Sequence, residues 1–335
     1  MEKARFKWVL RERNRKIAAK TEAFTEQQAR RVRSFHSSFK EYSPTPLIEL
    51  TSLAQHLGIK NLFVKDESYR FGLNAFKVLG GSFAIGSYIA NELGEDIDDL
   101  PYMRLVSDEV RSLLGSKTFI TTTDGNHGRG VAWTANRLKQ QAIVYMPQGS
   151  AAERLANIRA EGAQAEITDM NYDDTVRYTS ELAQKNGWII VQDTAWDGYT
   201  RIPLWIMQGY MTMALEAYEQ LPVKPTHIFL QAGVGSLAGS VQGFFADIYG
   251  SSCPLTFIVE PKGADCLYQT AAANDGSLHS VTGRLETIMA GLACGEPNSI
   301  AWEILGNLSD GFISCPDYTA AQGMRILGNP LAGDT

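Results

Sequence analysis

The sequence predicts an α/β protein with two parallel sheets, each covered by helices. Short apolar runs rich in β-branched residues alternate with segments of helical period, and 335 residues are too many for one small core. Strands that alternate with helices form parallel sheets with both faces buried. The predicted strands are the runs 61–66, 118–123, 142–147, 165–170, 188–193, 227–233 and 255–261. The predicted helices are 76–92, 128–139, 151–161, 173–186, 204–219 and 236–248.

A basic segment precedes the first predicted strand. Residues 1–40 carry 12 Lys or Arg against 4 Asp or Glu, whereas the rest of the chain carries 19 against 33. Because acidic residues interrupt the basic segment, we expect a solvated helix packed on the body of the protein, and not a transit peptide or a nucleic-acid-binding arm. The acidic remainder argues against a nucleic-acid partner.

The composition excludes several classes of protein. No apolar run approaches the roughly 18 residues of a membrane span, and the N-terminus lacks the apolar block of a secretory signal. The 4 cysteines lie far apart and the 5 histidines form no ligand pair, so neither a disulfide scaffold nor a structural metal is expected. We therefore expect a cytoplasmic enzyme that binds no metal and no membrane.

Parallel sheets bind ligands in the loops at the carboxyl ends of their strands, and three such loops contain unusual residues. The first, at 68–83, places Lys77 at the start of a helix beside Gly80 and Gly81. A lysine at such a position usually extends its charge to solvent. A desolvated lysine instead has a depressed pKa and can form a Schiff base with an aldehyde. The local sequence leaves both interpretations open.

The second loop, TTTDGNHGRG at 121–130, joins a strand to a helix. Asp124 and Asn126 would point from the sheet edge toward a bound ligand. Both residue types are also common helix N-caps, where they accept hydrogen bonds from backbone amides. This loop alone does not distinguish the two roles.

The third loop, QAGVGSLAG at 231–239, is glycine-rich and opens a helix. Glycines allow the backbone to approach a ligand closely, and a helix N-terminus attracts phosphate. The spacing Gly233-x-Gly235-x-x-Ala238, with Glu260 at the end of the next strand, also matches the dinucleotide-binding fingerprint of dehydrogenases. A tight turn without any ligand would need glycine as well.

Together the three loops fit one cofactor, pyridoxal 5'-phosphate. A lysine can link its aldehyde, an asparagine can bond its ring hydroxyl and a glycine loop can hold its phosphate. The chain resembles the fold-type II family of pyridoxal-phosphate enzymes, and most closely the diaminopropionate ammonia-lyase group. The segments that carry the resemblance are KDESYRFGLNAFKVLGG, TTTDGNHGRGVAW, TDMNYDDTVR, VQDTAWDGYTRIP, WIMQGY, QAGVGSLAG, IMAGLACGEPN and MRILGNP.

The resemblance implies a role for each candidate residue. Lys77 matches the Schiff-base lysine, and Asn126 matches the residue that hydrogen-bonds the pyridine hydroxyl. Asp124 stands where dehydratases place a serine, and Asp193 matches a second acidic residue of the site, so both are expected to be catalytic. The expected phosphate loop consists of Gly233, Val234, Gly235, Ser236 and Leu237.

The resemblance also implies two domains with the cofactor in the cleft between them. We expect a large cofactor-binding domain of residues 1–88 and 206–335, with a small domain of residues 89–205 inserted in it. The sequence stops at NPLAGDT, where the family continues with a S-G-E-S-G-A segment and a later strand, so we expect a large domain that lacks this piece. The family also implies a homodimer.

The implied reaction is the β-elimination of D- and L-2,3-diaminopropionate to pyruvate and two molecules of ammonia. Three alternatives remain: a serine/threonine dehydratase-like lyase, a dinucleotide-dependent dehydrogenase, and a truncated, non-catalytic remnant that binds pyridoxal phosphate. Cys266 and Cys294 flank family-like segments near the site. In a reducing cytosol we expect them to be thiols and not a disulfide.

Overall fold

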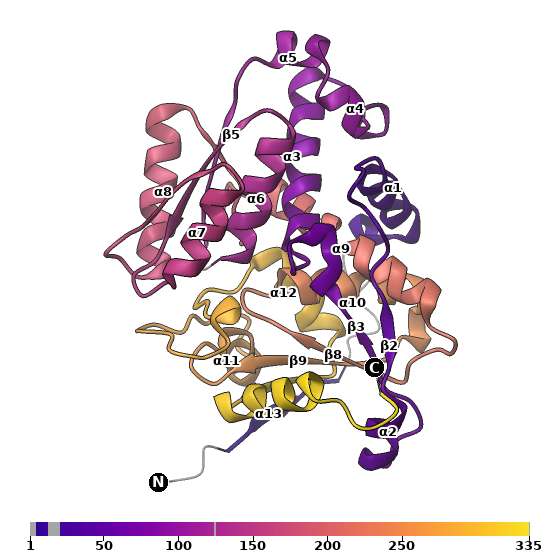
Figure 1. The fold of residues 1–335 in the computed structure, drawn as a ribbon. Coiled ribbons are helices and arrows are strands. Elements are labelled where there is room, and N and C mark those ends of the chain that lie inside the picture. Colours follow the sequence, from indigo (N-terminus) through magenta and orange to yellow (C-terminus); the bar gives the residue numbers. More distant parts are fainter. Residues whose placement is uncertain (1–4, 13–20, 124, 335) are drawn as a thin grey trace.

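The computed structural model describes residues 5–12, 21–123 and 125–334. Within these ranges the strands form two four-stranded sheets and one two-stranded ribbon. Figure 1 shows the two larger sheets in separate halves of the molecule, each with helices packed around it. The strands are β1 Lys7–Leu10, β2 Leu47–Glu49, β3 Phe63–Lys65, β4 Thr118–Thr122, β5 Gln141–Met146, β6 Gln164–Ile167, β7 Ile189–Ile190, β8 His227–Gln231, β9 Leu255–Pro261 and β10 Gly311–Cys315.

The helices predicted from the sequence correspond to α3 and α6–α10. Helix α9 carries Pro203 in its first turn, where a missing N–H costs no intrahelical hydrogen bond. The α-helices of the described ranges are α1 Glu26–Ser37, α2 Thr51–Leu57, α3 Lys77–Leu93, α4 Tyr102–Leu105, α5 Asp108–Leu114, α6 Asn126–Arg137, α7 Ala152–Ala160, α8 Tyr172–Asn186, α9 Arg201–Gln220, α10 Ser236–Tyr249, α11 Cys266–Ala273, α12 Ser299–Leu308 and α13 Asp317–Gly328.

The two sheets confirm the predicted α/β fold. One is wholly parallel, with the strand order β6-β5-β4-β7. The other has the order β1-β10-β9-β8, in which β8, β9 and β10 are parallel and β1 is an antiparallel edge strand. The domain limits expected at 88/89 and 205/206 stay a prediction.

Three strands differ from the sequence-based expectation. The run at 61–66 forms β3, which pairs with β2 in the antiparallel ribbon and not in a parallel sheet. Strand β10 was not predicted, because its sequence GFISC is short and contains glycine and serine. In the basic segment, the expectation of a helix is right for residues 26–37 and wrong for residues 7–10, which form β1.

Helix α3 lies against both α6 and α9 and carries Lys77 as its first residue. A Cβ on Gly130 of α6 would lie 2.8 Å from the Cα of Val78, and a Cβ on Gly209 of α9 would overlap the carbonyl oxygen of Leu79. Glycine at these two positions therefore lets both helices contact the backbone of α3. The start of α3 is fixed from two sides.

A buried ion-pair cluster holds the segment that leads into α3. Arg70, in the 3₁₀ helix η2 (Glu67–Gly72), is fully buried and pairs with Glu67 and with Glu216 of α9, each at 2.7 Å. Glu216 also pairs with Lys65 of β3 at 2.9 Å. Because a buried charge is costly without its partner, the cluster keeps this segment on α9.

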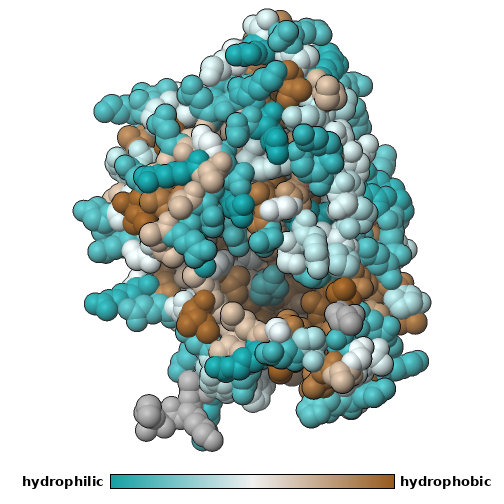
Figure 2. All heavy atoms as spheres, in the orientation of Figure 1, coloured by the Kyte–Doolittle hydropathy of each residue, from teal (hydrophilic) through white to brown (hydrophobic). Residues whose placement is uncertain are grey.

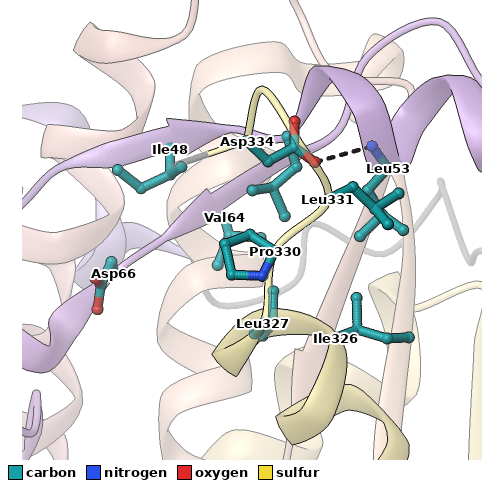
Figure 3. A pocket seen from close by; sticks show the side chains of 10 residues that line it. Ile48, Leu53, Val64, Asp66, Ile326, Leu327, Pro330, Leu331 and Asp334 are labelled. Atoms are coloured by element: carbon teal, nitrogen blue, oxygen red, sulfur yellow. Dashed lines mark hydrogen bonds between the residues drawn. The ribbon is translucent and has the colours of Figure 1, made fainter.

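A cavity of about 230 Å³ lies between the β2–β3 ribbon and the C-terminal segment (Figure 3). Asp334 accepts hydrogen bonds from the amides of Ser52 and Leu53, at 2.7 and 2.9 Å, and so ties this segment to the start of α2. None of the cavity's lining residues is a candidate site residue. The cavity is therefore separate from the chemistry considered below.

The surface around α13 is partly apolar. Met324, Leu327 and Leu331 are exposed there, and Figure 2 shows brown, apolar residues in patches over the lower part of this face. Among the helices of the described ranges, none has both the length and the apolar content needed to cross a membrane.

Candidate active site

Two of the predicted loops meet the segment after β7 around Lys77. The Lys77 ammonium forms an ion pair with the carboxylate of Asp193. The backbone carbonyl of Asp193 in turn accepts a hydrogen bond of 2.5 Å from the hydroxyl of Ser236, at the start of α10. The structure therefore brings the predicted lysine, the second acidic residue and the glycine loop together.

Burial and the ion pair shift the pKa values of Lys77 and Asp193 in opposite directions. Burial disfavours both charged forms, yet the attraction between the charges outweighs it. The pKa of Lys77 lies above its ordinary value and the pKa of Asp193 falls to about 2. In this arrangement Lys77 is an ammonium at neutral pH. It must lose a proton before its nitrogen can attack an aldehyde.

Two aromatic rings flank the Lys77 nitrogen. Lys77 Nζ lies 5.7 Å from the ring centre of Phe76 and 6.0 Å from that of Tyr210. The two rings pack edge to face, with centroids 5.2 Å apart. Their faces attract an ammonium, and their bulk shields this side of the nitrogen from water.

The turn between β4 and α6 places Asn126 as the first residue of α6, with its side chain exposed. Thr123 caps this turn, because its hydroxyl accepts hydrogen bonds from the amides of Gly125 (2.9 Å) and Gly128 (3.1 Å). The side chain of Asn126 is thus not needed as a cap. Asp124 lies outside the described residues, and the roles expected for Asp124 and Asn126 stay predictions.

His127, in the same turn, is buried and neutral. Its Nε2 donates a hydrogen bond of 2.7 Å to the carbonyl of Val191, which fixes the proton on Nε2. Burial lowers the pKa of His127, so the ring carries no charge at neutral pH. His127 therefore joins α6 to the chain that leads into Asp193.

The glycine loop can hold a ligand through its backbone, because its side chains are already engaged. The Ser236 hydroxyl donates to Asp193 and accepts a hydrogen bond of 2.8 Å from Asn298, while the side chains of Val234 and Leu237 are buried. Helix α10 has no side-chain N-cap, so the amides of its first turn lack intrahelical acceptors. A phosphate would complete this helix end.

We expect the variant Gly235→Val to weaken both the fold and cofactor binding. Gly235 has a φ of +100°, which disfavours any side chain, and a Cβ there would lie 3.2 Å from Leu267 and 3.3 Å from Leu305. The added atoms would crowd the core and displace the loop, at a cost of about 1–3 kcal/mol. Thermal unfolding of the cofactor-free protein and titration with pyridoxal phosphate measure the two effects. Unchanged stability and affinity would contradict this expectation.

A cavity of about 410 Å³ opens beside the glycine loop. It is lined by Val234 of the loop, by Thr194 and Trp196, which follow Asp193, and by Cys294. Residues of α8 line it as well. The volume falls in the range of small-molecule sites, so an amino acid could approach the loop from here.

All four cysteines lie in the described part of the chain, and none of them forms a disulfide. Cys266 and Cys294 both lie at the glycine loop: Cys266 Sγ is 3.8 Å from the carbonyl oxygen of Gly233, and a Cβ on Gly233 would be 3.3 Å from Cys294 Sγ. The expectation of thiols at both positions is confirmed.

Glu260 is not placed to bind a ribose. It is fully buried and accepts hydrogen bonds from the amides of Leu267 (2.9 Å) and Tyr268 (2.7 Å) in the first turn of α11. Burial raises its pKa. Both carboxylate oxygens are occupied by the amides of this helix end, so Glu260 cannot supply the ribose-binding acid of the dinucleotide fingerprint.

Sequence reasoning missed two residues of this site, Tyr210 and the cap Thr123. Tyr210 lies in the apolar segment WIMQGYM of α9, where an aromatic residue normally predicts core. Thr123 belongs to the motif TTTDGN, in which threonine, aspartate and asparagine can each cap a helix. Only the geometry of the turn shows that Thr123 is the cap.

Comparison with known proteins gives close matches to one family of enzymes. A family model described as "Pyridoxal-phosphate dependent enzyme" matches residues 39–330. The diaminopropionate ammonia-lyase of Escherichia coli K12 is 53% identical over 315 residues, which cover 93% of this chain and 77% of that protein. The Salmonella typhimurium enzyme of the same name is 53% identical over 306 residues, covering 90% of this chain and 76% of that protein.

Solved structures agree with these sequence matches. A crystal structure of holo diaminopropionate ammonia lyase from Escherichia coli superposes with a TM-score of 0.91 at 50% identity, covering 99% of this chain and 82% of that chain. Threonine deaminase isoform 2 of Solanum lycopersicum, at 20% identity, shares the fold with a TM-score of 0.75, covering 98% of this chain and 83% of that chain.

These matches confirm the predicted family, fold type, enzyme class and cofactor, and the dehydrogenase alternative is wrong. The chain spans about three quarters of the length of the two bacterial relatives. With a family model over most of its length and half of its residues identical to those enzymes, the chain belongs to the diaminopropionate ammonia-lyases, a group of pyridoxal-phosphate-dependent enzymes of fold type II.

Proposed function

We propose that this chain, with bound pyridoxal phosphate, removes both amino groups of 2,3-diaminopropionate and releases pyruvate and two molecules of ammonia, consuming one water. The observation that carries the proposal is the Lys77–Asp193 ion pair beside the glycine loop. It places an amine, a carboxylate and an uncapped helix N-terminus in one site. A structure of the Escherichia coli relative with an aminoacrylate-PLP azomethine reaction intermediate supports an elimination.

The residues present fit pyridoxal phosphate. The free amides at the start of α10 would hold its phosphate, Lys77 would meet its aldehyde, and Asn126 would bond its ring hydroxyl. When bound, the cofactor supplies an electron-withdrawing ring that makes the Cα proton of an amino acid acidic.

Lys77 and Asp193 divide the handling of protons on one face of the substrate. Neutral Lys77 Nζ takes the Cα proton from this face, a step that contributes about 10²–10⁴-fold to the rate. The carboxylate of Asp193 stabilises the ammonium that results, and this ion pair lowers the pKa of Asp193 to about 2. The rings of Phe76 and Tyr210 keep water away from the same nitrogen.

We expect the variant Asp124→Asn to reduce turnover of the D isomer by at least about 10²-fold and to spare part of the activity on the L isomer. From the family resemblance we infer that Asp124 would lie across the cofactor from Lys77, where its carboxylate would take the proton from the opposite enantiomer. It also attracts the substrate's second ammonium through a charge-assisted bond worth about 1.5–3 kcal/mol. The measurement is kcat/KM for both isomers with the same variant. Equal and small losses would rule out catalysis from two faces.

A substrate panel tests the proposed function directly. Pure protein with pyridoxal phosphate is given D- and L-2,3-diaminopropionate, serine and threonine, and both pyruvate and ammonia are measured. We expect two ammonia for each pyruvate from diaminopropionate, and slower release from serine. Faster turnover of serine or threonine would favour the dehydratase alternative. Covalent capture of the cofactor without any turnover would favour the alternative of a non-catalytic protein that binds pyridoxal phosphate.

The remaining parts of the proposal come from the family resemblance. We place the enzyme in the cytoplasm as a homodimer, with the cofactor between a large domain (1–88 and 206–335) and a small domain (89–205). Light scattering of the purified protein measures its mass in solution, and a monomer would contradict the dimer.

A further inference from the structure

The hydroxyl of Tyr210 is a buried polar group with no role in the reaction described above. Tyr210, in α9, has no exposed surface. Its hydroxyl has no hydrogen-bond partner within the described ranges. Buried hydroxyls are almost always paired, so an unpaired one at the edge of a site calls for an explanation.

Packing fixes the Tyr210 ring beside Lys77. The ring centre lies 6.0 Å from Lys77 Nζ, and Phe76 packs edge to face against it. There is no space for the ring to turn away toward α3, since a Cβ on Gly80 would lie 2.7 Å from its Cε1 atom. The ring is therefore held beside the lysine nitrogen, and the Lys77 ammonium acts electrostatically on its hydroxyl.

The phenol remains a hydrogen-bond donor in this pocket. Burial raises the pKa of Tyr210, and the opposing effect of the Lys77 ammonium does not cancel this rise. The hydroxyl consequently keeps its proton across the neutral and mildly alkaline range. It can donate that proton in a hydrogen bond without giving it up.

A phenol donor suits the neutral form of lysine. An ammonium has three N–H donors and no acceptor, whereas a neutral amine has a lone pair that accepts a hydrogen bond. Asp193 stabilises the ammonium, but Lys77 must be neutral to react with an aldehyde. A donor beside Nζ stabilises this reactive form.

We propose that Tyr210 is a positioning residue that donates a hydrogen bond to the neutral amine of Lys77 and holds its nitrogen for attack on the cofactor aldehyde. Lys77 then has Asp193 as the partner of its charged form and Tyr210 as the partner of its neutral form. The inference rests on the proposed function, because it takes Lys77 as the cofactor-linking lysine. Within the described ranges, His127, Tyr199 and Cys294 are further titratable groups that interact with this cluster, and all three are unchanged in the variants below.

The test compares Tyr210→Phe with Tyr218→Phe, the same change two turns later in α9, where the ring packs on Phe244. Cofactor-free protein is mixed with pyridoxal phosphate between about pH 6 and about pH 10. The rate of covalent capture is followed by visible absorption, and borohydride reduction with peptide mass analysis locates the product at Lys77.

We expect covalent capture at neutral pH to be roughly 3- to 10-fold slower in Tyr210→Phe, because the variant lacks one hydrogen bond to the lysine nitrogen. The rate should rise with pH in both proteins, and the profile of the variant should be displaced to higher pH, because the variant no longer stabilises the neutral amine. Tyr218→Phe should match the unaltered protein. Since the lost hydroxyl has no partner, the unfolding temperature of Tyr210→Phe should not fall.

Equal rates and equal pH profiles for Tyr210→Phe and the unaltered protein would overturn this inference and leave the proposed function standing. No capture at Lys77 in the unaltered protein would overturn the proposed function, and the inference with it. If Tyr210→Phe does not fold, replacement of Tyr210 by 3-fluorotyrosine gives the second test. This residue keeps the ring and the hydroxyl but is the stronger donor, so capture at neutral pH should be faster; an unchanged rate would overturn the inference.

Discussion

The variant Lys77→Ala is expected to lose turnover by at least about 10²–10⁴-fold and to stop capturing pyridoxal phosphate covalently. A methyl group has no nitrogen to react with the aldehyde and none to accept the Cα proton. The pKa of Asp193, now about 2, should rise, because a buried carboxylate without its partner favours the neutral form. The visible spectrum before and after borohydride, together with the rate of pyruvate release, measures the loss.

The matched control is Lys185→Ala, an exposed lysine in the last turn of α8. It removes the same side chain at a position that does not line the cavity, and should keep both the visible band and the turnover. A Lys77→Ala variant that retained the band and the activity of the unaltered protein would show that another amine holds the cofactor.

The variant Asp193→Asn is expected to lower both the pKa of Lys77 and the stability of the fold. Without the carboxylate, burial dominates, and burial favours the neutral amine. Removing one partner of a buried ion pair costs about 3–5 kcal/mol, and the amide of asparagine recovers only part of this by hydrogen bonding. Turnover should fall as well, because the ammonium formed by proton transfer to Lys77 loses its counter-charge.

The stability difference between Asp193→Asn and the unaltered protein should depend on pH. The folded pKa of Asp193, about 2, lies below its ordinary value of 3.8, so its stabilisation is complete above 3.8 and disappears as the pH falls toward 2. Denaturant unfolding at pH 7 and near pH 3 measures the difference. Asp197→Asn, an exposed change nearby, is the control and should show little difference at either pH. A constant difference for Asp193→Asn would mean that the Lys77 ion pair does not stabilise the fold.

The parts of the site that the sequence predicted share one property: they follow strands whose period is easy to recognise. Asp193 and the glycine loop come after the runs that form β7 and β8, so each was predicted at the carboxyl end of its own strand. These two strands belong to different sheets, and packing between the sheets brings Asp193 and the loop together. Lys77 was predictable from its place beside two glycines in an unusually small and apolar helix start. The family resemblance then assigned the chemistry of all three.

Other features depend on contacts between segments that are distant in the sequence. Strand β1 forms because residues 7–10 pair with β10, some 300 positions later, and nothing in their basic surroundings indicates a strand. Glu260 looks like a ribose-binding acid until the start of α11 is seen to occupy its oxygens. The sequence around Tyr210 predicts only a core residue, since the ring comes close to Lys77 Nζ only after α9 has packed on α3.

The packing of α3 between α6 and α9 also determines the order in which the site can form during synthesis. Lys77 leaves the ribosome well before Asp193, Tyr210 and the glycine loop, each of which lies more than 100 residues later in the chain. Contacts across such separations close slowly and late in folding. A nascent chain that ends before Asp193 has the lysine without its ion-pair partner, and one that ends before α10 still lacks the phosphate-binding helix end. Covalent capture of pyridoxal phosphate would thus be a late event in the life of the chain, and its onset would report that the fold is complete through α10.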